Sequence, residues 1–236
     1  LDYEDTIDPD LVDTTTTGLT TGTRLRFSEV LTGTLSLGFT REDEDGAPDT
    51  TDTLTAFFGL ERALANGSAS LGVTQSSEDG GEDRTTVEIG RRLDLPDGAL
   101  SARLGISRSD LGGSDMVGGL DWTHRLPDGE ITVSLTRSAS FDADADETTI
   151  DTAVALGWLH EINAVSSIAF DLSWELSDAP SERIEETEFG ATYSRSLTAD
   201  WRMDGGLRYS LRDDADGRAE SPLVFVSLGR SFNLRP

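Results

Sequence analysis

The chain has 236 residues, with 45 Asp and Glu against 19 Lys and Arg, a formal net charge of −26 and a pI near 4.1. Every one of those cations is arginine, and the chain contains no cysteine. Such a surface repels a phosphate backbone, which excludes a nucleic-acid binder, and without thiols there are no disulfides or zinc–thiolate sites.

Apolar and polar residues alternate along almost the whole chain. The alternation is clearest in the segments 31–40, 100–107 and 168–177, where every second residue is apolar or small. A period of two places the apolar residues on one face of a β-sheet and the polar residues on the other. No apolar run reaches the roughly 18 residues of a membrane helix. We therefore predict an all-β chain.

Thirteen alternating runs follow one another, most of them about twice as long as the usual strand of a globular protein. They are Thr14–Phe27, Leu31–Arg41, Thr51–Leu64, Ser68–Ser77, Arg84–Leu95, Ala99–Ser109, Asp115–Leu126, Glu130–Phe141, Thr148–Glu161, Ala164–Ser177, Glu185–Leu197, Asp200–Arg212 and Ser221–Leu234. Strands of this length are typical of a roughly 25–30 Å apolar slab crossed at a tilt of about 45°. Residues 1–5 are interpreted as the end of one more strand, truncated or contributed by residues upstream of Leu1. Because closed bacterial barrels have even strand numbers, we predict about fourteen strands, with twelve as the alternative.

The connections between these runs alternate in kind. Short connections are predicted at 28–30, 65–67, 96–98, 127–129, 162–163 and 198–199, with Asn-Gly and Pro-Asp-Gly among them. Longer, mostly acidic loops are predicted at 42–50, 78–83, 110–114, 142–147, 178–184 and 213–220. Asn, Asp and Gly accept the positive φ of tight hairpins, so the chain is predicted to be an antiparallel up-and-down sheet with short turns at one end and longer loops at the other.

Aromatic residues of the apolar parity fall near the strand ends. Phe27, Trp122, Trp158 and Trp201 lie near tight turns, whereas Phe39, Phe141, Trp174 and Tyr209 lie near the longer loops. Two aromatic belts at opposite strand ends are typical of the two interfaces between a membrane and water. The alternative, a soluble β-sandwich, would concentrate its aromatic residues in mid-strand.

On these features the chain resembles a Gram-negative outer-membrane β-barrel, in the style of the porin-type barrels of alphaproteobacteria. The resemblance covers Thr14–Leu234, and Leu223–Phe232 is similar to the terminal assembly signal of that class, although Asn233–Pro236 follow the aromatic residue. It implies one transmembrane barrel domain over residues 1–236, in which residues 1–13 form a partial first strand and an outer loop and residues 14–234 the full strands. It also implies short periplasmic turns, acidic extracellular loops and an outer-membrane location. The partners it implies are outer-membrane lipid and lipopolysaccharide, with another envelope protein as a further candidate.

The polar parity then lines the interior. Its predicted lumen-lining residues are Arg24, Arg26, Glu61, Glu88, Arg92, Arg103, Asp121, Arg125, Asp151, Asp171, Glu175, Glu188, Arg202, Asp204, Arg208 and Arg212. A dry interior would have to pair nearly all of these charges, because an isolated buried ion costs several kcal/mol. We interpret the interior as a mixed-charge, water-filled pore for passive diffusion of small polar solutes. The alternative is a structural or partner-bound barrel whose interior is closed by salt bridges.

Neither catalysis nor a bound metal or cofactor is expected. Barrel enzymes rely on a histidine with an acid or serine, but His124 and His160 lie near tight turns on the apolar parity beside Trp122 and Trp158. The acidic loops lack the downstream glutamate of a calcium loop, so we interpret them as solvated loops. Five arginines also fall on the apolar parity. They are Arg62, Arg91, Arg137, Arg195 and Arg230, and Arg91 and Arg137 fit a lipid-facing position least well.

Overall fold

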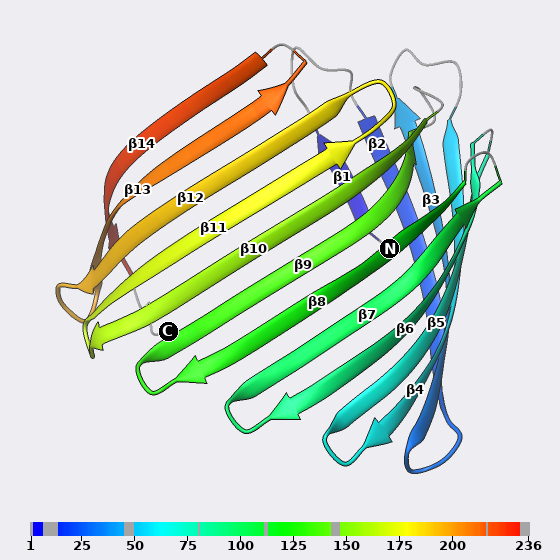
Figure 1. Ribbon diagram of the computed structural model, residues 1–236, viewed down its shortest axis with the longest axis horizontal. Helices are drawn as coiled ribbons and strands as arrows, with labels where there is room; N and C mark the ends of the chain where they lie inside the picture. The colour runs from blue at the N-terminus through cyan, green and yellow to red at the C-terminus, as the bar shows by residue number, and fades with distance from the viewer. Residues whose placement is uncertain are drawn as a thin grey trace, which may run out of the picture. The chain divides into compact units, whose positions relative to one another are not determined.

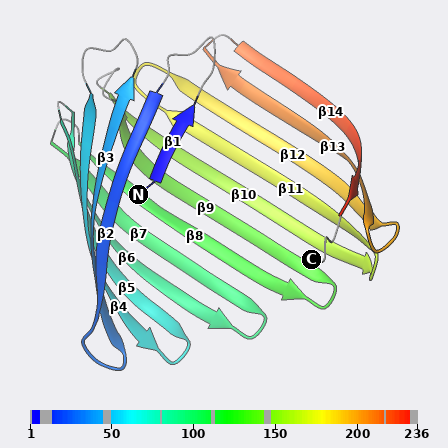
Figure 2. The ribbon, with the colours of Figure 1, turned by 180° about the vertical axis from the view of Figure 1, so that it is seen from behind.

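The structure is a computed structural model, and it describes residues 2–6, 14–44, 50–79, 81–110, 113–142, 147–215 and 217–231. These residues form one sheet of fourteen strands that follow each other in chain order (Figure 1, Figure 2). The ladders are antiparallel, so the sheet is an up-and-down meander. Over the described residues, no helix is long and apolar enough to cross a membrane.

Thirteen of the strands have 12 to 17 residues, and the first has five. Their bounds are β1 Asp2–Thr6, β2 Thr14–Arg26, β3 Leu31–Glu44, β4 Thr51–Leu64, β5 Gly67–Glu78, β6 Asp83–Leu95, β7 Gly98–Ser109, β8 Ser114–Leu126, β9 Gly129–Asp142, β10 Glu147–Asn163, β11 Ser166–Asp178, β12 Arg183–Ser196, β13 Trp201–Asp214 and β14 Gly217–Arg230. The long strands match the predicted runs and β1 matches the predicted partial strand, which favours fourteen over the twelve-strand alternative. The outer loop predicted before Thr14 and the residues after Ser231 lie outside the described residues.

Two predicted connections differ from the structure. The turn predicted at 162–163 lies at Ala164–Val165, because β10 continues through an irregularity between Glu161 and Asn163. The Val165 amide donates to the Asn163 side chain at 3.0 Å, which turns the chain two residues later than the composition indicated. The loop predicted over 213–220 is also shorter, since β13 and β14 pair as far as Asp214 and Gly217.

One tight turn shows why glycine is needed there. The hairpin between β4 and β5 closes with Leu64 opposite Gly67, and Gly67 has a φ of +125°. A Cβ at this position would run into the backbone carbonyl of Arg92 on the neighbouring strand β6. Glycine therefore serves both the backbone conformation and the close approach of the next strand.

The printed registers divide the sheet into an apolar face and a polar face. In β3–β6, Leu35 lies opposite Phe58 and Leu71 opposite Ile89. In β10 and β11, Leu156 lies opposite Leu172. The residues between them carry the Ser, Thr, Gly and charged side chains, as the period of two predicts. We call these two surfaces the apolar face and the polar face.

The apolar face is not covered by a second layer. Among the described residues, Val117 is the single buried hydrophobic residue, whereas Ile89 is 62% exposed and Val224 is 81% exposed. A soluble sandwich would bury these side chains between two sheets at a gain of roughly 1.5–3 kcal/mol each. The sandwich alternative therefore does not describe this chain.

The contacts group the chain into two compact units. The first unit comprises Leu1–Leu93, Ala102–Gly118 and Ala139–Thr148, and the second comprises Asp94–Ser101, Gly119–Ser138 and Thr149–Pro236. The two end strands of the order are β1 and β14, and no ladder between their described residues is found. The single domain over 1–236 stays a prediction.

Candidate functional site on the polar face

In the first unit, the predicted lumen residues share one face. The polar-face residues found there are Arg24, Arg26, Glu61, Glu88, Arg92 and Arg103. The register places Arg26 beside Thr32 and Glu61 beside Ser70, and an ion pair of 3.7 Å joins Arg103 to Glu88. The side chains of this last pair are 51% and 34% exposed, so the pair stays in contact with water.

In the second unit, the predicted residues again share a face. Asp151, Asp171, Glu175, Glu188, Arg202, Asp204, Arg208 and Arg212 all lie on the polar positions of β10–β13. Asp121 and Arg125 alternate with Trp122 and His124 along β8, so they lie on the side of that strand opposite the two rings. Their roles as lumen-lining residues stay a prediction.

The arginines of β13 pair with carboxylates on the same strand and on the neighbouring strand β12. Arg208 lies 3.1 Å from Glu188, and Arg212 lies 2.5 Å from Glu186. Arg202 and Asp204, two residues apart on β13, pair at 2.8 Å. The arginine side chains of these pairs are 48–62% exposed. The pairs are therefore hydrated, and exposed pairs of this kind contribute at most about 1 kcal/mol each.

These pairs leave an excess of negative charge on β11. Glu175 lies directly opposite Glu186, and among the described residues no partner is found for the Glu175 carboxylate. The same holds for Asp171, whose carboxylate lies over Gly190 on β12. This part of the polar face therefore carries more negative than positive charge, and its electrostatic potential favours cations over anions.

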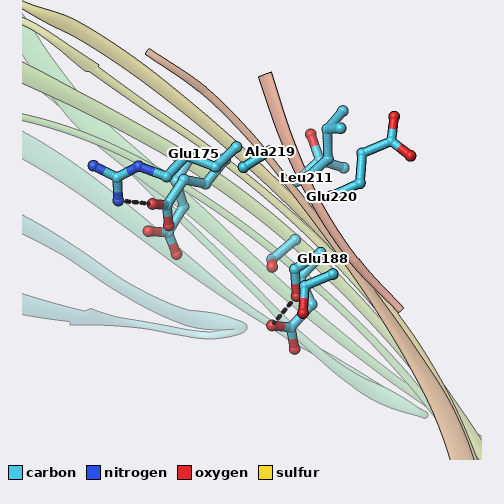
Figure 3. Close-up of a pocket in the computed structure, with 11 residues that line it drawn as sticks. Glu175, Glu188, Leu211, Ala219 and Glu220 are labelled. Carbon is cyan, nitrogen blue, oxygen red and sulfur yellow. Dashed lines mark hydrogen bonds and ion pairs between the residues drawn. The ribbon is translucent and has the colours of Figure 1, made fainter. Parts of the chain in front are cut away.

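A surface pocket of about 410 Å³ lies over these strands (Figure 3). Its lining includes Ser173 and Glu175 from β11 and Ser210 from β13, whose hydroxyl lies 3.3 Å from Glu188. Figure 3 also shows that Glu220 of β14 points away from Glu175. The pocket is open and combines apolar lining such as Leu211 with carboxylates and hydroxyls, and it can hold water and small hydrated solutes.

A second, buried cluster lies on the polar face of the first unit. The Glu82 side chain is 2% exposed and lies 2.6 Å from the guanidinium of Arg84, which is 11% exposed. Arg84 also donates to the Ser107 hydroxyl at 3.2 Å, and that hydroxyl lies 2.9 Å from the Thr86 hydroxyl. Among the described residues, no hydrogen-bond partner is found for Glu82 Oε1. We call these four residues the buried cluster.

An exposed ion pair in the same unit contrasts with the buried cluster. Arg41 at the loop end of β3 donates to Asp52 of β4 through Nε at 2.7 Å and through Nη2 at 2.5 Å. These hydrogen bonds lower the pKa of the Asp52 carboxyl below its ordinary value of 3.8. The pair therefore stabilises the fold at neutral pH, and that contribution is lost only as the pH falls through the lowered pKa.

The polar face also holds large apolar side chains among its Ser, Thr, Gly and charged residues. The Phe57 ring lies over Gly59 and over Gly72 on the next strand, where added Cβ atoms would lie 2.7 and 3.2 Å from it. On β14, Phe225 covers Gly206 in the same way, and Leu223 lies opposite Arg208. In the sequence, the adjacent residues Phe57 and Phe58 place one phenylalanine on each face of the strand, and this pair could have indicated a large apolar side chain on the polar face.

Several aromatic residues of the predicted belts lie at apolar-face positions, and their role as membrane-interface belts stays a prediction. The Trp158 ring stacks on Phe170 with a centroid distance of 5.4 Å, and Trp174 Nε1 donates to Glu185 at 2.8 Å near the loop end. Phe27 packs against Gly33. The side chain of Phe141 lies outside the described set.

The structure places the two arginines that fitted the apolar face least well. Arg91 reaches back to the tight turn, where it donates to the Ser68 carbonyl at 2.9 Å and to Asn66 Oδ1 at 2.7 Å. Arg137 donates to Thr152 Oγ1 on the adjacent strand at 2.9 Å. Both guanidinium groups therefore have polar partners on the sheet.

The two histidines stack on tryptophans. The ring centroids of Trp122 and His124 lie 5.6 Å apart, and those of Trp158 and His160 lie 5.7 Å apart. In the part of the chain that the structure describes, no group of three or more His, Asp or Glu residues is arranged to hold a metal ion. The interfacial position of both histidines stays a prediction.

Comparison with known proteins finds similarity only among solved structures. No family model and no curated protein matches the chain. The NanC porin matches at 11% identity over 76% of this chain and 94% of its own, with a TM-score of 0.34. The translocator domain of the autotransporter NalP from Neisseria meningitidis matches at 14% identity over 98% and 85%, with a TM-score of 0.32. The siderophore receptor PirA from Pseudomonas aeruginosa matches at 8% identity over 98% and 65%, with a TM-score of 0.36.

These three proteins are outer-membrane β-barrels. The all-β antiparallel sheet of this chain fits a resemblance to that class. At such identities and TM-scores the likeness goes no further.

Proposed function

We propose that the chain is a channel-forming β-barrel of the Gram-negative outer membrane that lets small polar solutes diffuse passively through a mixed-charge lumen. The exposed apolar face supports the membrane location, because hydrocarbon is the environment in which large side chains such as Ile89, 62% exposed, cost nothing. A sheet in hydrocarbon has to satisfy its edge amides, so the proposal includes closure of the sheet into a barrel.

The observation that carries the channel proposal is the water-accessible charge on the polar face. The Arg208–Glu188 and Arg212–Glu186 pairs keep side-chain exposures of 40–53%. Ions that remain hydrated need no desolvation and do not require a closed interior. Water and small solutes can therefore pass along this face, with lipid and lipopolysaccharide as the surroundings of the barrel.

A second candidate is a structural or partner-bound barrel with a closed, salt-bridged interior. The buried cluster around Glu82 and Arg84 favours it, since these side chains are only 2% and 11% exposed. The two candidates differ in conductance. A channel is expected to conduct, and a closed barrel that binds another envelope protein is not.

Single-channel recording of the full chain in planar bilayers tests the proposal. We expect stable ohmic steps and a modest preference for cations in a KCl gradient, because Glu175 adds unpaired negative charge to the polar face. Glu175→Gln is expected to reduce that preference. The matched control is Glu220→Gln, which removes a carboxylate that also lines the pocket but sits at an apolar-face position of β14 and points away from Glu175, and it is expected to leave the selectivity unchanged (Figure 3). Absence of conductance, or strong anion selectivity, would contradict the channel proposal.

A further inference from the structure

We propose that the turn end of the apolar face binds the phosphate headgroups of anionic glycerophospholipids through its arginines. This inference rests on the proposed membrane location. The arginines concerned lie in the halves of the strands next to the tight turns. We consider β2–β6 and β10–β14, because the pairing of these strands assigns each of their residues to one face. We call their apolar-face positions the turn-end rim, and the corresponding positions next to the longer loops the loop-end rim.

The charge of the turn-end rim has one sign. Among the described positions of the two ladders it holds Arg62, Arg91, Arg195 and Arg230 and no carboxylate. This is unexpected in a chain with 45 acidic residues against 19 basic ones. An even spread of charge along the strands would place acidic residues there more often than arginines.

The loop-end rim of the same face has the opposite balance. Its carboxylates are Asp43, Asp52, Asp83, Asp178, Glu185, Asp213 and Glu220, and its arginines are Arg41, Arg183 and Arg218. Several of these charges bond to each other, as Arg41 does to Asp52. The two rims of the apolar face therefore present different charges to the two boundaries of a membrane.

In the first unit, Arg62 and Arg91 lie on the two strands that flank Ala69 of β5. Both are directly opposite Ala69, Arg62 from β4 and Arg91 from β6. Arg91 is held by its hydrogen bonds to the turn, which fixes its guanidinium at the end of the strand. Arg62 is exposed, and within the described residues no partner for its guanidinium is found.

In the second unit, Arg195 and Arg230 flank the end of β13. Arg195 lies opposite Met203 and is exposed, again with no partner in the described part of the chain. Arg230 lies opposite Trp201, with its guanidinium carbon 5.4 Å from the ring centroid. Tryptophan prefers the headgroup level of a membrane, so the guanidinium beside it lies at the depth of the phosphates.

An anionic phospholipid is the partner that this arrangement fits. Its acyl chains would cover the apolar side chains, and its phosphate would accept hydrogen bonds from the guanidinium groups of Arg62 and Arg195, for which the described residues supply no carboxylate. A cation near an anionic membrane surface is worth about 1 kcal/mol, a preference of about fivefold for each arginine.

The test measures the association of spin-labelled phosphatidylglycerol and phosphatidylcholine with the full chain reconstituted in phosphatidylcholine vesicles. We expect the wild type to prefer phosphatidylglycerol, and the preference to fall as salt rises because exposed charges are screened. Arg62→Gln with Arg195→Gln removes the two unpartnered rim arginines and is expected to lower the association constant at each site by about fivefold.

The matched control is Arg24→Gln with Arg26→Gln. It removes the same charge from the turn end of the polar face, where no lipid is proposed, and is expected to keep the wild-type preference. If the protein restricts the motion of both lipids without preferring phosphatidylglycerol, this inference is overturned and the membrane location still stands. The same conclusion follows if both double variants lose the preference for phosphatidylglycerol equally. A protein that restricts neither lipid would overturn the membrane proposal and this inference together.

Discussion

Glu82→Ala is expected to destabilise the folded protein by about 3–5 kcal/mol, the largest loss that we predict for a single ion pair of this chain. The substitution leaves the Arg84 guanidinium buried with only the Ser107 hydroxyl as a described partner. A buried charge without its counter-ion bears its full desolvation cost. The measurement is urea unfolding of the protein folded in lipid vesicles.

Two further variants separate this effect from general damage. Asp52→Ala breaks the exposed Arg41–Asp52 pair of the same unit, with side chains 48% and 26% exposed, and is expected to cost far less than Glu82→Ala because water screens the exposed charges. Replacing Glu82 and Arg84 together by Leu removes both buried charges and is expected to recover most of the loss. Equal losses for Glu82→Ala and Asp52→Ala would contradict the buried cluster.

Leu172→Arg is expected to cost about 2–4 kcal/mol in a bilayer, the second-largest predicted effect. Leu172 lies in the middle of β11, is 45% exposed, and faces Leu156 and Phe189 across the neighbouring strands of the apolar face. An arginine there would enter hydrocarbon at mid-depth. If the face met water instead, an exposed leucine could be replaced at a cost within about 0.5 kcal/mol.

The adjacent residue provides the control. Ser173 lies on the polar face opposite Glu188 and lines the pocket that also contains Glu175. Ser173→Arg is expected to change the stability little, because the new charge stays in water beside carboxylates. Unfolding of both variants in vesicles compares two neighbouring positions of one strand, and equal losses would be inconsistent with a lipid-facing side of β11.

The strands and their faces were predictable because a period of two is local information. The runs of alternating residues around Leu35, Leu104 and Leu172 each indicate which side chains share a face. This assignment does not depend on which strand lies next to the run. The thirteen long strands therefore begin close to the predicted residues. The exception near Asn163 arose from a strand irregularity, which adds a residue that no alternation pattern records.

The interactions on the polar face were not predictable in the same way. Parity gives the face of Arg212 but not its partner, because the pairing with Glu186 depends on the register between β12 and β13. The buried cluster depends on how the connection between β5 and β6 brings Glu82 onto Arg84. Such a loop conformation is set by tertiary contacts, so the residues that favour a closed interior were missed in the sequence.

Every proposal for this chain requires that the apolar face contacts hydrocarbon and that the polar face contacts water. The most direct test is a scan of single spin labels along β11, Ser166–Asp178, with the protein in vesicles and with oxygen and a water-soluble nickel chelate as relaxing agents. We expect spin labels at even-numbered positions such as 170, 172 and 174 to be highly accessible to oxygen, and labels at 171, 173 and 175 to be highly accessible to the nickel chelate. Uniform nickel contact along the strand, or no alternation, would contradict this expectation.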